Sequence, residues 1–297
     1  MMQALNGSIV ALITPMHESG EIDYVSLSNL IEWHIEQGTS GIVSVGTTGE
    51  SATLSVKEHI HVIEKTVNYV EGRIPVIAGT GSNSTAQAIE TTMESKRVGA
   101  DFCMLVTPYY NKPSQAGLIQ HYLKIAESVE IPQILYNVPS RTSIDLRPET
   151  VEIISQHPNI IGIKEAVNDN QRMKDLINLA NSLEKDFSVF SGDDPSFIKL
   201  LKLGGHGVIS VAANIVPDKI SEICSLIMNG DEEKATKMIE KYQDLFELLF
   251  IESNPVPAKW MLFKMNMIKN NLRLPLIELD KKFHEKINNE MLKLELL

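Results

Sequence analysis

The sequence contains little of what marks secreted, membrane-spanning or nucleic-acid-binding proteins. Only two of its 297 residues are cysteines, Cys103 and Cys224, which favours a reducing compartment over a disulfide-stabilised fold. No apolar run approaches the roughly 20 residues that a membrane span requires, and the first residues lack a positively charged region followed by an apolar stretch. A formal net charge of -11 without a basic cluster argues against nucleic acid as a partner. We therefore expect a cytoplasmic protein with no membrane association.

Signature motifs for nucleotide and metal binding are also missing. No Gly-x-Gly-x-x-Gly follows the first apolar run, which leads instead into Thr14-Pro15-Met16-His17. No glycine-rich loop ends in Lys-Ser or Lys-Thr, so phosphate binding has no motif to support it. The histidines are scattered, and His59 and His61 lie two apart in a helical stretch, so they do not share a face. The sequence predicts neither a metal nor a bound cofactor.

The chain does contain a regular alternation of apolar runs and amphipathic stretches. Eight apolar runs are typical of strands: Ser8–Thr14, Gly41–Gly46, Pro75–Gly79, Phe102–Thr107, Gln133–Asn137, Ile160–Lys164, Ser188–Ser191 and Gly207–Val211. Most are continuously apolar, as in parallel strands that are covered on both faces. Amphipathic stretches between them include Tyr24–Gln37, Val56–Glu71, Thr85–Val98 and Gln171–Leu183. The pattern predicts an α/β fold, a (β/α)8 TIM barrel over residues 1–217; a doubly wound sheet is the alternative.

Three of the helical stretches begin with residues that commonly cap helices. Asp23 precedes the first of them, and Ser55 precedes the second, with Glu58 three residues further on. Ser84 or Thr85 begins the third. These residues predict where the helices start.

The alternation stops after Asn214, and four helical stretches follow. They are Asp218–Gly230, Asp231–Glu252, Pro257–Lys269 and Ile277–Leu297. Residues 218–297 are therefore predicted to form a helical region that follows the barrel in the sequence, as a C-terminal appendage. The methionine-rich segment Met261–Met267 indicates helix packing rather than a cofactor site.

Lys164 is the residue that most directly indicates a chemical activity. It lies in Asn159–Ala166, a run otherwise apolar enough to be a buried strand. Burial disfavours the charged ammonium group and lowers the pKa of a lysine, which leaves a neutral amine that attacks carbonyls to form a Schiff base. Taken alone, the segment slightly favours a lysine whose stem is buried and whose ammonium group reaches water. The residues around it decide between these interpretations.

Polar residues stand at the ends of the predicted strands, where barrel enzymes place their active sites. Tyr136, one strand before Lys164, is placed to move protons for a Schiff base, although many buried tyrosines only bond the backbone. Thr47 and Thr48 offer hydroxyls and backbone N–H groups that suit a small carboxylate, or else form a simple tight turn. Arg141 is able to hold a second carboxylate. Together these residues favour an active site around Lys164.

Eight stretches along the chain match, in order, the motifs of one known family. They are Gly46–Ser51, Pro75–Gly81, Val106–Gln115, Leu135–Thr142, Gly162–Ala166, Ser191–Asp194, Leu203–Val211 and Asn254–Trp260. In these stretches the chain resembles the dihydrodipicolinate synthase and N-acetylneuraminate lyase family, and the resemblance spans nearly its whole length. The resemblance implies a lyase on a TIM barrel, a pyruvate-dependent enzyme of the class I aldolase type that uses no cofactor beyond a covalent Schiff base with pyruvate.

The resemblance also implies roles for individual residues. Lys164 matches the Schiff-base lysine, Tyr136 the proton donor and acceptor, and Thr47 and Tyr110 the remainder of a proton relay, with Tyr110 supplied by a neighbouring subunit. Thr48 and Ile209 match pyruvate-contacting positions with Gly192 nearby, and Arg141 matches the arginine that binds the carboxylate of the aldehyde substrate. The implied reaction condenses pyruvate with L-aspartate 4-semialdehyde to 4-hydroxy-tetrahydrodipicolinate, on the route to diaminopimelate and lysine. The implied assembly is a homotetramer, a dimer of dimers.

Two features place the chain nearer to the synthase branch than to the sialic acid lyases. One is the pair Thr47-Thr48, and the other is Ser140-Arg141-Thr142 after Tyr-Asn-Val-Pro. Sialic acid lyases usually lack that arginine, because their second substrate is a long neutral polyol. A pyruvate-releasing aldolase acting on a sugar acid remains the alternative activity, and a binding protein without catalysis is the alternative of another class.

In lysine-inhibited relatives, the resemblance implies a regulatory site between subunits. Its positions in this chain are Ser51, Ala52, Leu54, Val56, His59, Asn83, Gln87 and Tyr109. Val56 stands where feedback-sensitive members carry histidine, and Gln87 stands where a glutamate usually receives the ammonium group of lysine. Loss of that carboxylate removes a charge-assisted hydrogen bond worth roughly 1.5–3 kcal/mol. We therefore predict that this site is weakened and that lysine inhibits weakly or not at all.

Overall fold

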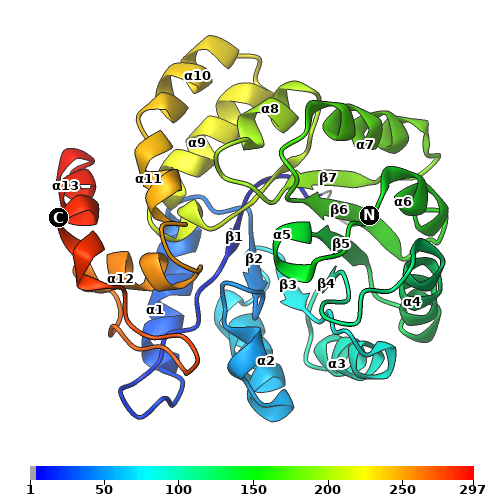
Figure 1. Cartoon of the computed structure of the whole chain (residues 1–297), viewed down its shortest axis with the longest axis horizontal. Helices are drawn as coiled ribbons and strands as arrows, with labels where there is room; N and C mark the ends of the chain where they lie inside the picture. Colours follow the sequence, from blue (N-terminus) through cyan, green and yellow to red (C-terminus); the bar gives the residue numbers. More distant parts are fainter. Residues whose placement is uncertain (1–4) are drawn as a thin grey trace.

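The computed structural model of the chain describes residues 5–297, across which eight strands form one closed barrel. The strands are β1 (Gly7–Ala11), β2 (Gly41–Ser44), β3 (Val76–Gly79), β4 (Phe102–Val106), β5 (Gln133–Asn137), β6 (Ile160–Glu165), β7 (Ser188–Ser191) and β8 (Gly207–Ser210). Each strand pairs in parallel with the next along the chain, and β8 pairs with β1 (Figure 1). The predicted TIM barrel is confirmed, and each predicted strand overlaps an observed one, although the first was predicted to run three residues too far, to Thr14.

The barrel closes where two glycines meet. Gly7 of β1 and Gly207 of β8 are paired in register. A Cβ atom on Gly207 would lie 2.2 Å from the carbonyl oxygen of Gly7, a distance that no side chain tolerates. The first and last strands therefore approach closely enough to pair only because this position has no side chain.

Helices surround the barrel and cover the outer faces of the strands (Figure 1). They are α1 (Tyr24–Glu36), α2 (Val56–Val70), α3 (Thr85–Arg97), α4 (Gln115–Ser128), α6 (Pro148–Ile154), α7 (Asn170–Ser182), α8 (Phe197–Lys202) and α9 (Pro217–Met228), with the short α5 (Pro139–Thr142) after β5. Asp23 and Ser84 cap α1 and α3 as predicted, and Ser55 forms a capping box with Glu58 at α2. Local sequence therefore fixes where these helices begin.

The C-terminal region is helical, but it is more interrupted than predicted. Its helices are α10 (Glu232–Glu240), α11 (Gln243–Leu248), α12 (Val256–Lys264) and α13 (His284–Lys293), the last preceded by a 3-10 turn at Lys281–Phe283. The single helix predicted over Asp231–Glu252 is wrong, because the chain turns after α10 so that Ile239 and Phe246 both reach the core. The helices predicted over Pro257–Lys269 and Ile277–Leu297 are likewise too long.

The C-terminal helices share an apolar core with the barrel. One cluster of buried side chains contains Val10 and Ile42 from the strands together with Trp260, Met261 and Met291 from α12 and α13. A smaller cluster fills the barrel interior and includes Tyr136 and Ile209. The division of the chain at residue 217 stays a prediction; in the structure α9 lies against β1 and belongs to the layer around the barrel.

Two remaining features concern the predicted location. Cys103 and Cys224 are both buried, and neither forms a disulfide. Within residues 5–297, no helix has the length and apolar character needed to cross a bilayer. The cytoplasmic location stays a prediction.

Candidate active site

The C-terminal ends of the strands surround a cavity of about 430 Å³. Six of the eight residues predicted for catalysis or substrate binding line it: Thr47, Thr48, Tyr136, Arg141, Lys164 and Gly192. They come from the turn after β2, from β5 and α5, from β6 and from the turn after β7. The cavity therefore brings together residues that were expected to act together and that lie up to 145 positions apart in the sequence, from Thr47 to Gly192.

Lys164 lines this cavity and is buried. It is 5% exposed, and its Nζ atom lies 4.3 Å from the centroid of the Tyr136 ring. Burial lowers the pKa of Lys164 to about 8, an effect that Arg141 increases and the carboxylate of Asp194 opposes. A substantial fraction of the amine is therefore neutral near physiological pH, as a nucleophile requires.

The turn after β7 approaches Lys164 closely. A Cβ atom on Gly192 would lie 2.8 Å from Cε of Lys164, so a side chain here would displace the lysine stem. Asp194 in the same turn accepts hydrogen bonds from the Ser210 hydroxyl at 2.5 Å and from the backbone N–H groups of Val211 and Ala212 at 3.0 Å each. These bonds fix the turn to the end of β8 and keep Gly192 beside Lys164.

Tyr136 keeps its proton over the physiological range. Burial raises the pKa of its phenol to about 12, partly offset by the charge of Arg141 and by the Thr47 hydroxyl. A phenol at this position acts as a proton donor and regains the proton afterwards, as each step of Schiff-base chemistry demands. The Tyr136 ring lies over the lysine nitrogen that gains and loses protons.

A second buried lysine, which the sequence analysis did not single out, has a different environment. The side chain of Lys259 on α12 is fully buried and forms an ion pair with Glu50, in the turn that follows Thr47 and Thr48. Its Nζ atom also donates a hydrogen bond of 2.8 Å to the carbonyl oxygen of Asn271. Because this ammonium group is held by a carboxylate, Lys259 is not a nucleophile. The signal was present in the apolar run around Lys259, but its partner lies 209 residues away.

Asn254 is the other site residue that sequence reasoning missed. It lies between α11 and α12, is 6% exposed, and lines the cavity. Its side-chain Nδ2 donates to the hydroxyl of Thr48 at 3.0 Å, and its carbonyl oxygen accepts from Nη2 of Arg141 at 3.4 Å. The C-terminal region thus links both proposed substrate-binding side chains, and the matched stretch Asn254–Trp260 was the only trace of this in the sequence.

Two predicted residues do not line the cavity. Ile209 is 1% exposed and packs in the barrel interior with Tyr136. Tyr110 lies on the loop after β4, has a φ of 73°, and is 91% exposed. Tyr110 thus does not line the Lys164 cavity within one chain, and the role predicted for it stays a prediction that requires a second copy of the chain.

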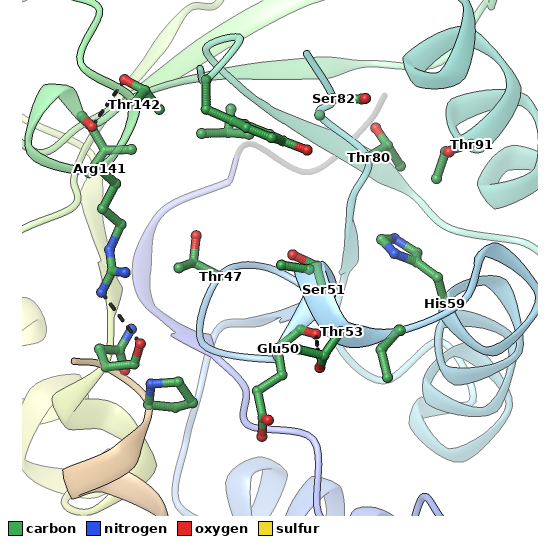
Figure 2. A pocket seen from close by; sticks show the side chains of 18 of the residues that line it. Thr47, Glu50, Ser51, Thr53, His59, Thr80, Ser82, Thr91, Arg141 and Thr142 are labelled. Atoms are coloured by element: carbon green, nitrogen blue, oxygen red, sulfur yellow. Dashed lines mark hydrogen bonds between the residues drawn. The ribbon is translucent and has the colours of Figure 1, made fainter. Parts of the chain in front are cut away.

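A neighbouring cavity of about 420 Å³ contains most of the predicted regulatory residues. Ser51, Ala52, Leu54, Val56, His59, Gln87 and Tyr109 line it, whereas Asn83 does not. Figure 2 shows His59, Ser51 and Thr80 around this cavity, with Arg141 and Thr47 at the side shared with the first cavity. Glu50 contributes the only carboxylate among its lining residues in the described part of the chain, and that carboxylate is directed away and paired with Lys259.

Potential metal ligands are scattered across the described part of the chain. Within the described residues, no three His, Cys, Asp or Glu side chains are placed to hold a metal ion together.

Known proteins resemble this chain over almost its whole length. The Dihydrodipicolinate synthetase family matches residues 4–293. A 4-hydroxy-tetrahydrodipicolinate synthase from Pseudomonas aeruginosa strain PAO1 is 53% identical over 285 residues, covering 96% of this chain and 97% of that protein. A solved structure of the chloride-inhibited dihydrodipicolinate synthase from Acinetobacter baumannii, complexed with pyruvate, is 49% identical with a TM-score of 0.95, covering 98% of this chain and 99% of the other. A second structure, described as the first monomeric dihydrodipicolinate synthase variant, is 38% identical with a TM-score of 0.96 and covers 99% of this chain and 98% of its own.

Proposed function

The chain belongs to the dihydrodipicolinate synthetase family, and we propose that it acts as a 4-hydroxy-tetrahydrodipicolinate synthase in which Lys164 binds pyruvate covalently. It is a lyase of the Schiff-base-forming, class I aldolase type. The substrates are pyruvate and L-aspartate 4-semialdehyde, and the pathway is that of diaminopimelate and lysine. The observation that carries the assignment to Lys164 is a buried amine with a pKa lowered to about 8, held beneath the Tyr136 ring.

The covalent step begins with the neutral amine of Lys164. Its lone pair attacks the keto carbon of pyruvate, and the resulting carbinolamine loses water to give an iminium ion. The pyruvate methyl group then loses a proton, its C–H electron pair forms the C=C bond of an enamine, and the electron pair of the iminium C=N bond moves onto the nitrogen. The enamine carbon attacks the aldehyde carbon, whose oxygen receives a proton, and the product amine closes the ring and releases Lys164. The iminium is the electron sink, so the proposal needs no resident cofactor.

Each proton transfer requires a group close to the lysine nitrogen. Tyr136 takes this role, with Thr47 beside its hydroxyl. The Thr48 turn binds the pyruvate carboxylate, and Gly192 lines the same cavity beside the Lys164 stem. Arg141 binds the carboxylate of the aldehyde substrate through paired N–H donors. This arginine favours a short acidic aldehyde over the neutral polyol of a sugar acid.

Assembly completes the relay in this proposal. Tyr110 is 91% exposed on a loop held by the Asn111 side chain, which donates to the Asn83 carbonyl oxygen at 2.8 Å. A tyrosine displayed in this way is suited to enter the site of a second copy, and the proposed assembly is a homotetramer built from two dimers. Sedimentation analysis of the wild type and of Tyr110→Ala measures the assembly, and activity at equal site concentration measures the contribution of the phenol.

Trapping with borohydride tests the covalent step directly. Reduction in the presence of pyruvate should add the mass of the reduced pyruvyl group to one peptide, and fragmentation should place it on Lys164. Lys164→Arg, which keeps the charge and most of the volume, is the matched variant and should take no label. A label on Lys259, or an unlabelled protein, contradicts the proposal and favours a binding protein without this chemistry.

A further inference from the structure

The outer face of β5 and β6 carries a buried polar group that the proposed mechanism does not use. Tyr136 and Lys164 are paired across these two strands, and the next pair along them is Asn137 and Glu165. Successive side chains of a strand point to opposite faces. Asn137 and Glu165 therefore lie on the outer side of the barrel, directly behind the two residues proposed to carry the chemistry.

Asn137 and Glu165 are bonded to each other. Nδ2 of Asn137 donates to both carboxylate oxygens of Glu165, at 3.1 and 3.0 Å, and to Oδ1 of Asp145 at 2.9 Å. Its Oδ1 atom accepts from the backbone N–H of Leu146 at 2.9 Å. The backbone N–H of Val167 donates to Glu165 at 2.8 Å. This contact joins β5 to β6 at the level of the active-site floor and adds to the backbone ladder there.

Arg172 of α7 completes the group. Its guanidinium donates to Asp145 at 2.6 and 3.0 Å and to Glu165 at 3.4 Å. The Glu165 side chain is 2% exposed, that of Arg172 16% and that of Asp145 37%. Two carboxylates thus share one guanidinium, and the more deeply buried carboxylate has the longer contact.

We propose that Glu165 is a positioning residue, whose ionised carboxylate holds β5 and β6 in the spacing that keeps Tyr136 over Lys164. The inference rests on the function proposed above and adds a residue to it. Every hydrogen bond to the side-chain oxygens of Glu165 comes from a donor group, on Asn137, Val167 or Arg172. A protonated carboxyl would place its own O–H among these donors, so the contacts seen require the carboxylate.

The protonation state of Glu165 changes within the physiological range. Burial, and to a smaller extent the charge of Asp145, raise the pKa of its carboxyl, while the bonds from Asn137 and Val167 and the charge of Arg172 lower it; the resulting pKa is about 7. The charged groups that face Glu165 are Asp145 from the α5–α6 loop and Arg172 from α7. Asn137 on β5 is neutral, and Lys164 on its own strand points to the other face.

The pH dependence of kcat, the rate at saturating substrate, is the measurement that reports the protonation of Glu165. Under these conditions Lys164 is already in the imine, so its own titration does not contribute to kcat, and Tyr136 titrates far above neutrality. The wild-type kcat should fall as pH drops through about 7, when Glu165 gains a proton. Glu165→Gln should lose this acidic limb and show a kcat roughly 10- to 100-fold lower at pH values where wild-type Glu165 is ionised, because small displacements of reacting groups are costly.

Two further variants keep the test decisive if Glu165→Gln folds poorly. Asp145→Asn removes a charge that raises the pKa of Glu165, so the acidic limb should move to lower pH. Arg172→Met removes a charge that lowers this pKa, so the limb should move to higher pH. Glu152→Gln, an exposed position on α6, is the matched control and should leave the profile unchanged.

Borohydride labelling with pyruvate separates this inference from the function on which it rests. If Lys164 is labelled in both proteins while Glu165→Gln keeps the wild-type kcat and the same acidic limb, the positioning role is overturned and the function stands. Shifts of the limb in the same direction for Asp145→Asn and Arg172→Met would also overturn it. If wild-type Lys164 takes no label, the proposed function itself fails.

Discussion

Glu50 and Lys259 form an ion pair from which solvent is completely excluded. Glu50 follows the Thr47-Thr48-Gly49 turn in a left-handed backbone conformation, with a φ of 57°. Its second oxygen accepts the backbone N–H of Arg273 at 3.3 Å. The pair therefore attaches the turn that lines the active-site cavity to α12 and to the segment that follows it, across more than 200 residues of sequence.

Removing one partner of this pair should be strongly destabilising. Lys259→Met keeps an apolar stem of similar length but leaves the Glu50 carboxylate buried without a counter-charge. Such a change costs about 3–5 kcal/mol in other proteins. The free energy of unfolding, measured by urea denaturation at neutral pH, should fall by that amount.

The double variant Glu50→Gln with Lys259→Met is the control for charge. It removes both charges, so most of the lost stability should return, even though the hydrogen bonds are not fully restored. If the single variant is as stable as the wild type, the buried ion pair contributes no more to the free energy of unfolding than an ion pair at the surface does. If the double variant is no more stable than the single one, packing rather than charge explains the loss.

The pH dependence of pyruvate capture should follow Lys164. Only the neutral amine attacks pyruvate, so kcat/KM for pyruvate should rise with pH and level off above about 8, the pKa to which burial lowers this lysine. Asp194→Asn removes a charge that raises this pKa, so the midpoint should move to lower pH. A midpoint that stays near the ordinary lysine value in both proteins would show that the amine is not held in a dry environment.

Arg141 should distinguish between the two substrates. Arg141→Met removes the guanidinium and retains part of the stem, so the aldehyde carboxylate loses a charge-assisted partner worth roughly 1.5–3 kcal/mol. The value of kcat/KM for L-aspartate 4-semialdehyde should drop by about 10- to 100-fold, while borohydride labelling of Lys164 by pyruvate persists. If kcat/KM fell equally for both substrates, Arg141 would stabilise the shape of the cavity rather than bind the carboxylate of the aldehyde.

The strands and the residues at their ends could be predicted from the sequence because their signals are local. Ile160–Lys164 is an apolar run interrupted by a lysine, and the structure places that lysine 4.3 Å from the tyrosine ring predicted to serve it. The helix starts at Asp23, Ser55 and Ser84 were equally local, since a cap is read from adjacent residues.

Contacts between distant segments could not be predicted in this way. Asn254 reaches Thr48 across 206 residues, and nothing in its neighbourhood shows that its amide would face a threonine. The break between α10 and α11 has the same origin, because a continuous amphipathic pattern does not reveal that the chain must turn to bury both Ile239 and Phe246. Glu165 was within a matched stretch, but its role depends on Arg172 and Asp145 from other elements.

Lysine inhibition provides the last prediction. The cavity lined by Val56, His59 and Gln87 holds no free carboxylate among its described lining residues, since that of Glu50 is paired with Lys259. The Gln87 side-chain oxygen accepts from the Ser82 hydroxyl at 3.0 Å and offers an ammonium group only a neutral acceptor. Lysine should therefore inhibit the wild type weakly in a coupled assay. Gln87→Glu should lower the half-inhibitory lysine concentration by about 10- to 100-fold, the effect of a charge-assisted bond.

The control for this prediction is a variant at Glu90, three residues after Gln87 on the same helix. Glu90→Gln changes one charge on α3 outside the residues that line the cavity, so it should leave lysine inhibition unchanged. Because Gln87→Glu adds a negative charge, its effect should also diminish as salt is raised, whereas an effect of shape would not. Submillimolar half-inhibition of the wild type would contradict the argument from the missing carboxylate, since the cavity would then bind the ammonium group through neutral acceptors alone.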